Sequence, residues 1–97
     1  MEKVWLKSYQ EGVPAEIDLH QYRSLGEMVA QSVAKFRERP AYINMGVQIT
    51  YGQLDKLSRD FAAYLQQVLK LPKGARLAVM MPNILQYPIA ILGALRA

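Results

Sequence analysis

Residues 74–97, GARLAVMMPNILQYPIAILGALRA, decide how this chain folds, because they contain its two most apolar segments. Residues 77–81 form a continuous apolar run rather than an alternating one, which is typical of a strand covered on both faces in a parallel sheet. A Pro-Asn pair interrupts the run, and the helix predicted over residues 84–96 has no polar face before Arg96. The last quarter of the chain therefore predicts a buried strand, residues 76–80, and a helix that is buried on nearly all sides.

The start of this last helix depends on Pro88. If Asn83 caps the helix, with Gln86 three residues on as in a capping box, Pro88 lies beyond the first turn and kinks the helix. If Tyr87 is the cap, Pro88 takes the favoured first position. No Gly, Asn or Pro follows Leu95 as a stop signal, so we expect these residues to be the beginning of a larger protein.

The chain is predicted to divide into an irregular arm, residues 1–22, and an α/β subdomain, residues 23–97. Turn residues and scattered aromatic side chains characterise the arm, and we expect these aromatics to pack against the subdomain. Ser24 and Glu27 form a capping-box pattern that begins a helix over residues 25–37. Its apolar residues recur at helical spacing, so one face should meet the core.

A β-hairpin and a second helix follow. The β-prone segments 41–45 and 47–49 flank a Met-Gly pair, whose glycine can adopt a positive φ. A second capping box, which begins at Thr50, precedes an amphipathic helix over residues 53–69, and its solvent face is predicted to carry Asp55. The sequence thus predicts an α/β fold with three helices, a β-hairpin and a buried strand.

The composition indicates a globular cytosolic protein. With 52% hydrophobic and 21% charged residues, the chain is not intrinsically disordered, and no stretch approaches the ~18 uninterrupted apolar residues of a membrane span. The N-terminus lacks the apolar core of a secretory signal, so we place the protein in the cytosol. The absence of cysteine fits that compartment and excludes disulfides, thiolate nucleophiles and cysteine metal sites.

The formal charge of +4 is unevenly distributed. Residues 1–60 contain eight basic and eight acidic side chains, whereas residues 61–97 contain four basic ones and no acid. A nucleic-acid surface would need a patch or stripe of cations, which these dispersed residues do not form, so we predict no nucleic-acid partner. His20 is the only histidine, and without a second histidine or a cysteine it is not predicted to be a base or a metal ligand.

Several stretches carry a resemblance to a known family. Residues 50–65, TYGQLDKLSRDFAAYL, residues 73–83, KGARLAVMMPN, and the ending GALRA are similar to the start of the acyl-adenylate-forming ligases. Within that superfamily, the stretches VWL, FAAYLQQ and MMPNILQYP most resemble bacterial long-chain fatty acid–CoA ligases. The similarity covers essentially the whole chain, which is identified as an N-terminal fragment of a member of that family.

The resemblance implies an enzyme that uses ATP and magnesium to convert a long-chain fatty acid to an acyl-adenylate and then transfers the acyl group to coenzyme A. It also implies a cytoplasmic enzyme that associates peripherally with the inner face of the cell membrane. The family's phosphate loop, ribose-contacting aspartate, acyl tunnel and catalytic lysine lie outside this sequence, whose six glycines are dispersed. We therefore predict no catalytic, cofactor-binding or metal-binding residue here, with the remainder of the polypeptide as the main partner.

A second hypothesis follows from the apolar last helix and the basic second half of the chain. The chain could be a self-standing basic interaction module that binds a partner through its C-terminal helix. A reading frame that stops at Ala97 would favour this module, whereas one that continues for several hundred codons would favour the ligase.

We expect the isolated chain to form homo-oligomers through its last helix. Ile89, Ile91, Leu92 and Leu95 are each worth about 1.5–3 kcal/mol when fully buried, or roughly 6–12 kcal/mol together, which rivals the stability of a small domain. Sedimentation equilibrium at micromolar concentration should show a dimer or larger species. Replacing Ile91 and Leu95 with glutamate should dissociate it or prevent folding. A stable, well-dispersed monomer of the unmodified chain would contradict this prediction.

Overall fold

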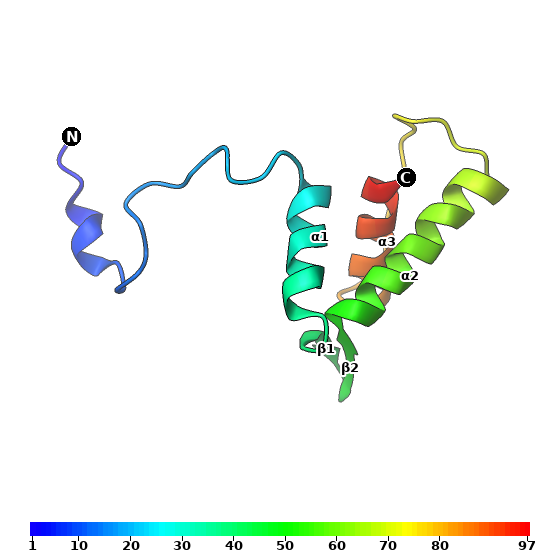
Figure 1. Cartoon of the computed structure of the whole chain (residues 1–97), viewed down its shortest axis with the longest axis horizontal. Helices are drawn as coiled ribbons and strands as arrows, with labels where there is room; N and C mark the ends of the chain where they lie inside the picture. Colours follow the sequence, from blue (N-terminus) through cyan, green and yellow to red (C-terminus); the bar gives the residue numbers. More distant parts are fainter.

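The computed structural model describes residues Met1–Ala97 and shows three α-helices packed beside a two-stranded antiparallel sheet (Figure 1). The predicted α/β fold with three helices and a hairpin is confirmed. In chain order the elements are η1 (Val4–Ser8), α1 (Leu25–Phe36), β1 (Pro40–Asn44), β2 (Val47–Thr50), α2 (Tyr51–Ala63), η2 (Tyr64–Val68) and α3 (Gln86–Arg96).

Local capping interactions begin α1 and α2. At α1, Ser24 Oγ accepts a hydrogen bond from the Glu27 N–H at 3.1 Å, while the Glu27 carboxylate accepts from the Arg23 N–H at 2.6 Å rather than from Ser24. At α2 the capping box is complete. Thr50 Oγ1 accepts from the Gln53 N–H at 3.1 Å, and Gln53 Oε1 accepts from the Thr50 N–H at 2.8 Å. These bonds satisfy backbone donors that a helix N-terminus otherwise leaves free.

The hairpin turn is a two-residue connection. Met45 and Gly46 have φ angles of +50° and +79°, the pair of positive values that a type I′ turn requires. The turn places Asn44 opposite Val47, and the strands stay in register until an irregularity near Ala41. The predicted hairpin is therefore confirmed, with a left-handed Met45 at its tip.

Backbone hydrogen bonds join the end of α1 to the start of α2. The Gly52 N–H donates to the Arg37 carbonyl at 2.9 Å, and the Tyr51 N–H donates to the Arg39 carbonyl at 3.0 Å. The rings of Phe36 and Tyr51 lie 5.9 Å apart beside these bonds. The chain between the two helices consequently projects as the hairpin (Figure 1).

Small residues allow α2 and α3 to approach closely. A Cβ at Gly93 would lie 2.6 Å from Cδ1 of Phe61 and 2.9 Å from the Ser58 carbonyl oxygen, distances that real Cβ atoms do not adopt. Ser58 is 1% exposed, and Ala62 and Ala90 are also buried at this contact. Backbone therefore packs almost directly on backbone here, and only glycine fits at position 93.

The core of the chain is small. Only nine of the 97 residues are buried, and the apolar ones among them are aliphatic, with no aromatic side chain. The buried apolar residues are Val33, Ile49, Leu54, Ala62, Leu65 and Ala90. In α3 only Ala90 and Gly93 are buried, and Leu95 is 53% exposed. Because α1 and α2 cover only part of this helix, its burial on nearly all sides stays a prediction for the larger protein to which these residues are expected to belong.

The predicted strand at residues 76–80 is absent. These residues form no regular element, Leu77 is 40% exposed and Met80 is 98% exposed. A strand exists only when a neighbouring strand pairs with its N–H and carbonyl groups. The only sheet consists of β1 and β2, and neither strand pairs with this segment.

The start of α3 differs from both alternatives considered for it. The helix begins at Gln86, with Leu85 in the capping position and no side-chain cap. Pro88 is therefore the third residue of the helix. An N–H at that position has no partner within a helix, so the proline removes no hydrogen bond and produces no kink.

The arm before α1 extends away from the helices (Figure 1). Trp5 and Tyr9 are 44% and 42% exposed, so the expectation that these aromatics pack against the subdomain is wrong, although Tyr22 is half-buried. An ion pair between Lys3 and Glu16, 3.0 Å long, links two parts of the arm to each other rather than to the helices. The 3₁₀ turn η1 is its only helical element.

Replacement of Gly93 by alanine should destabilise the chain by about 1–3 kcal/mol, because the added methyl group overlaps Phe61 and the Ser58 carbonyl. Gly26 in α1 is the matched control, since a Cβ there meets only Ser24 Oγ at 3.7 Å. Its replacement by alanine should be neutral or stabilising by up to about 1 kcal/mol. Urea unfolding followed by far-UV circular dichroism measures both changes, and equal effects would contradict the close contact.

Candidate functional site

The most concentrated group of charged side chains surrounds Asp55, whose side chain is 6% exposed. Arg96 of α3 donates one guanidinium N–H to an Asp55 carboxylate oxygen and another to the Asp55 backbone carbonyl at 2.9 Å. Arg59, one turn further along α2, donates to the second carboxylate oxygen at 2.9 Å. Arg37, just after α1, lies 3.8 Å from the same oxygen. One buried carboxylate thus connects all three helices.

This cluster suits a structural role better than a catalytic one. Each carboxylate oxygen of Asp55 accepts a hydrogen bond from an arginine and only 6% of the side chain is exposed, so the carboxylate is directed at its partners rather than toward a substrate. A buried charge is tolerated when it is paired and hydrogen-bonded, and here every partner is a charge-assisted donor or a nearby cation. The prediction that Asp55 lies on the solvent face of the helix is wrong. Asp55, Ser58 and Ala62 share the buried face instead.

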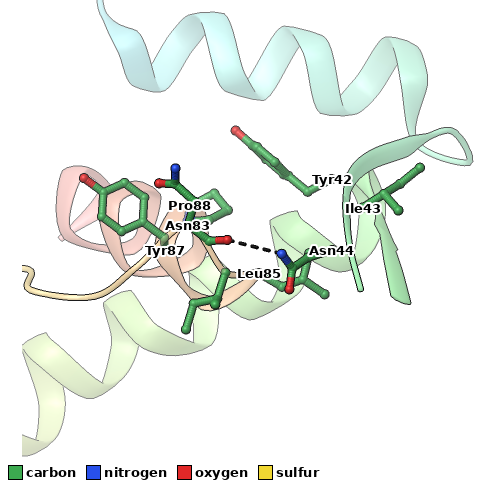
Figure 2. Close-up of a pocket in the computed structure, with 8 residues that line it drawn as sticks. Tyr42, Ile43, Asn44, Asn83, Leu85, Tyr87 and Pro88 are labelled. Atoms are coloured by element: carbon green, nitrogen blue, oxygen red, sulfur yellow. Dashed lines mark hydrogen bonds between the residues drawn. The ribbon is translucent and has the colours of Figure 1, made fainter. Parts of the chain in front are cut away.

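A pocket of about 230 Å³ lies between the hairpin and the turn that precedes α3 (Figure 2). The side-chain amide of Asn44 donates to the Asn83 carbonyl at 3.2 Å and links the two sides. Figure 2 shows the hairpin residues on one side and the turn residues on the other. The lining consists of Tyr42, Ile43, Asn44, Asn83, Ile84, Leu85, Tyr87 and Pro88. The lining contains no charged side chain, and its polar groups are the two side-chain amides and the hydroxyls of Tyr42 and Tyr87.

A second hollow, of about 350 Å³, lies among the three helices and β1 and is almost wholly apolar. Ser32 is the only residue in its lining that is not hydrophobic. The lining consists of Met28, Val29, Ser32, Ala41, Tyr42, Tyr51, Leu54 and Leu92. An apolar hollow of this kind can take further apolar side chains, and its lining contains no charged side chain.

The residues considered as candidates in the sequence do not come together. His20 lies in the exposed arm, where its backbone N–H donates to Asp18 Oδ1 at 2.9 Å. No three His, Cys, Asp or Glu side chains are grouped so that they could bind a metal ion. Gly12, Gly46 and Gly74 each have a positive φ, but they occupy three separate turns. That these residues include no catalytic, cofactor-binding or metal-binding group stays a prediction.

Comparison with known families and proteins gives a consistent result. A family model described as "AMP-binding enzyme" matches residues 29–97. The whole chain is 58% identical to a "Long-chain-fatty-acid--CoA ligase" of Yersinia pestis, 55% identical to one of Escherichia coli O157:H7 and 52% identical to one of Salmonella typhimurium. In each case the match covers 100% of this chain and 17% of the relative's length. No solved structure gives a significant match.

Replacement of Asp55 by asparagine should destabilise the chain by about 2–5 kcal/mol, because it leaves the partly buried guanidinium of Arg96 without its counter-ion. Asp60 provides the matched control on the same helix. Its ion pair with Lys56 is 2.7 Å long but well exposed, so the same replacement there should change stability by no more than about 1 kcal/mol. Urea unfolding measures the change in the free energy of unfolding for both variants. If the Asp55 replacement changes it no more than the Asp60 replacement does, the cluster does not stabilise the fold.

Proposed function

Because the chain belongs to the AMP-binding enzyme family, we propose that it is the N-terminal portion of a long-chain fatty acid–CoA ligase. The observation that carries this proposal is the identity of 50–58% over the whole chain to ligases of that name from several bacteria. The chain spans 17% of the length of these curated relatives, so the reaction itself belongs to a longer polypeptide.

The proposed enzyme catalyses an adenylyl transfer followed by an acyl transfer. In the first, the fatty acid carboxylate attacks the α-phosphorus of ATP, which forms the acyl-adenylate and releases pyrophosphate. In the second, the thiol of coenzyme A attacks the acyl carbon, which forms the thioester and releases AMP. A divalent cation, proposed to be magnesium, would supply positive charge to offset that of the phosphates, and it would be held by residues outside these 97. ATP, magnesium and coenzyme A are thus the proposed cofactors and cosubstrates.

These 97 residues contribute framework rather than chemistry to the proposed enzyme. Their buried polar cluster holds helices together, and the lining of their largest apolar hollow bears no charged group. Several of their large apolar side chains, such as Leu95 and Met80, are exposed to solvent, because the three helices and the hairpin do not bury them. We propose that the remainder of the polypeptide covers these surfaces and carries the catalytic groups.

We also propose that the enzyme works in the cytoplasm and associates peripherally with the inner face of the cell membrane. This part of the proposal rests on the resemblance to bacterial long-chain ligases. The helices of the chain are all too short, or too polar, to cross a bilayer. Nothing in the structure or the comparisons favours the alternative of a self-standing interaction module.

The full-length protein should catalyse fatty acid-dependent exchange of pyrophosphate into ATP and should form acyl-CoA when coenzyme A is added. Hexadecanoate should support a higher kcat/KM than acetate or a free amino acid, which separates a long-chain ligase from other adenylate-forming enzymes. The 97-residue chain, assayed in parallel, should remain at the level of a vector control. Pyrophosphate exchange by the 97-residue chain alone would contradict the proposal that the catalytic groups lie in the remainder of the polypeptide. A full-length enzyme that prefers acetate or an amino acid would contradict the substrate class.

A further inference from the structure

Asp55 has more arginines around it than its carboxylate uses. One carboxylate oxygen accepts a hydrogen bond from Arg96 and the other accepts one from Arg59. The guanidinium of Arg37 lies 3.8 Å from the second oxygen, which is too far for a hydrogen bond, and no other acid forms an ion pair with it. A third cation is therefore held beside this carboxylate without a counter-ion of its own.

The charges of the cluster do not balance. Three guanidiniums and one carboxylate leave two positive charges, since arginine stays protonated in proteins. Glu38, which follows Arg37 in the sequence, pairs with none of these cations. The side chains of Arg37 and Arg59 are 58% and 70% exposed, whereas that of Arg96 is 24% exposed. The surplus charge thus lies at the surface, where a ligand in solution can reach it.

The start of α2 holds Arg37 in position. The Arg37 carbonyl accepts a hydrogen bond from the Gly52 N–H at 2.9 Å. A Cβ at position 52 would lie 3.1 Å from Cγ and 3.5 Å from Nε of Arg37, so the arginine side chain crosses the first turn of α2 where glycine leaves room. A side chain that is already ordered by packing loses less conformational entropy when it binds a ligand.

Arg37 and Arg59 present unused hydrogen-bond donors beside one another. A guanidinium has five N–H groups, of which Arg59 uses one for Asp55 and Arg37 uses none. Both side chains approach the same carboxylate oxygen, at 3.8 Å for Arg37 and 2.9 Å for Arg59, so the two guanidiniums are neighbours. Planar guanidinium groups match the oxygen atoms of phosphates and carboxylates. Two of them side by side have the chemistry of an oxyanion site.

We propose that Arg37 and Arg59 form a binding site for a phosphate monoester where the end of α1 meets α2. A dianion offsets both surplus charges, whereas a single carboxylate offsets only one. Lys35 and Arg39 lie 5.2 Å and 5.3 Å from the centre of the Phe36 ring and add to the positive potential at this end of α1. The site goes beyond the proposed ligase reaction, whose catalytic groups are proposed to lie in the remainder of the polypeptide.

Calorimetric titration of the full-length protein with inorganic phosphate tests the site. The titration is made at about pH 8, where phosphate is mostly a dianion. A Kd on the order of 1 mM is expected, because exposed ion pairs each contribute little free energy. Acetate carries one charge and should bind several-fold more weakly. A protein that binds no phosphate, or that binds acetate as tightly as phosphate, would overturn the inference.

Arginine variants of the full-length protein locate the bound phosphate. Arg37→Gln should raise the Kd for phosphate by about three- to tenfold. Arg23→Gln is the matched control and should leave the Kd unchanged. Arg23 also lies 3.8 Å from a carboxylate, that of Glu27, but this carboxylate pairs with no second arginine. Equal Kd values for the two variants would overturn the inference, because the phosphate would then bind elsewhere.

A conservative variant keeps the test valid if Arg37→Gln is insoluble. Arg37→Lys retains the charge but not the planar group of N–H donors, so its Kd for phosphate should exceed that of the unmodified protein. A Kd equal to that of the unmodified protein would exclude a hydrogen-bonding role for the Arg37 guanidinium and would overturn the site as proposed.

Vesicle flotation distinguishes two sources of the phosphate monoester. The full-length protein is mixed with vesicles of phosphatidylcholine alone or with phosphatidic acid added, whose headgroup is a phosphate monoester. Flotation that requires phosphatidic acid and is lost in Arg37→Gln, but not in Arg23→Gln, identifies the ligand as a lipid headgroup. Phosphate binding without such flotation identifies it as a soluble phosphate ester. Flotation on phosphatidic acid that both variants retain equally would count against the site.

The phosphate titration and the ligase assay fail independently. Phosphate binding that depends on Arg37, in a full-length protein that forms no acyl-adenylate, would refute the proposed function and leave the phosphate site intact. Acyl-adenylate formation by a protein whose phosphate binding is unaffected by Arg37→Gln would refute the phosphate site alone.

Discussion

The ion pair between Arg96 and Asp55 is the contact on which the arrangement of the helices depends. It joins the last residue of α3 to the second turn of α2, and Arg37 extends it to the end of α1. A buried carboxylate destabilises the fold unless it is paired and hydrogen-bonded. Any sliding of α3 along α2 that separates the pair would therefore raise the free energy of the folded state. Close packing at Gly93 lets the two backbones approach near enough for the arginine to reach. The charge selects one register of the two helices, and the small residues make that register possible.

Interactions between residues close in the chain were predictable from the sequence, and those between distant residues were not. The capping bonds at Ser24 and Thr50 span three residues, and the hairpin turn spans two, so residue types at short spacing indicate them directly. Asp55 and Arg96 are 41 residues apart, and no local pattern marks them as partners. The one available signal is that Asp55, Ser58 and Ala62, which are small or polar, recur along one face of α2 and are buried there.

The candidate site was still less predictable. The pocket of Figure 2 forms between two segments about 40 residues apart, and neither carries a chemical motif that would indicate a cavity. The functional assignment rests on the resemblance of residue patterns to a family and on the match to that family's model, and not on reactive side chains. Likewise, the prediction of a strand from the apolar run is wrong for these residues, because a strand needs hydrogen bonds to a neighbouring strand and this segment has none.

The position of the only tryptophan affects how the stability of this chain can be measured. Trp5 lies in the arm, away from the buried residues around α2, and is 44% exposed. Its fluorescence would therefore respond to events in the arm and would hardly change when the three helices unfold. Because coincident transitions from different probes are the usual sign of two-state unfolding, fluorescence and circular dichroism would disagree even if the helices unfold in a single step. A tryptophan introduced in place of a half-buried aromatic at the α1–α2 junction, such as Phe36, would report on the core directly.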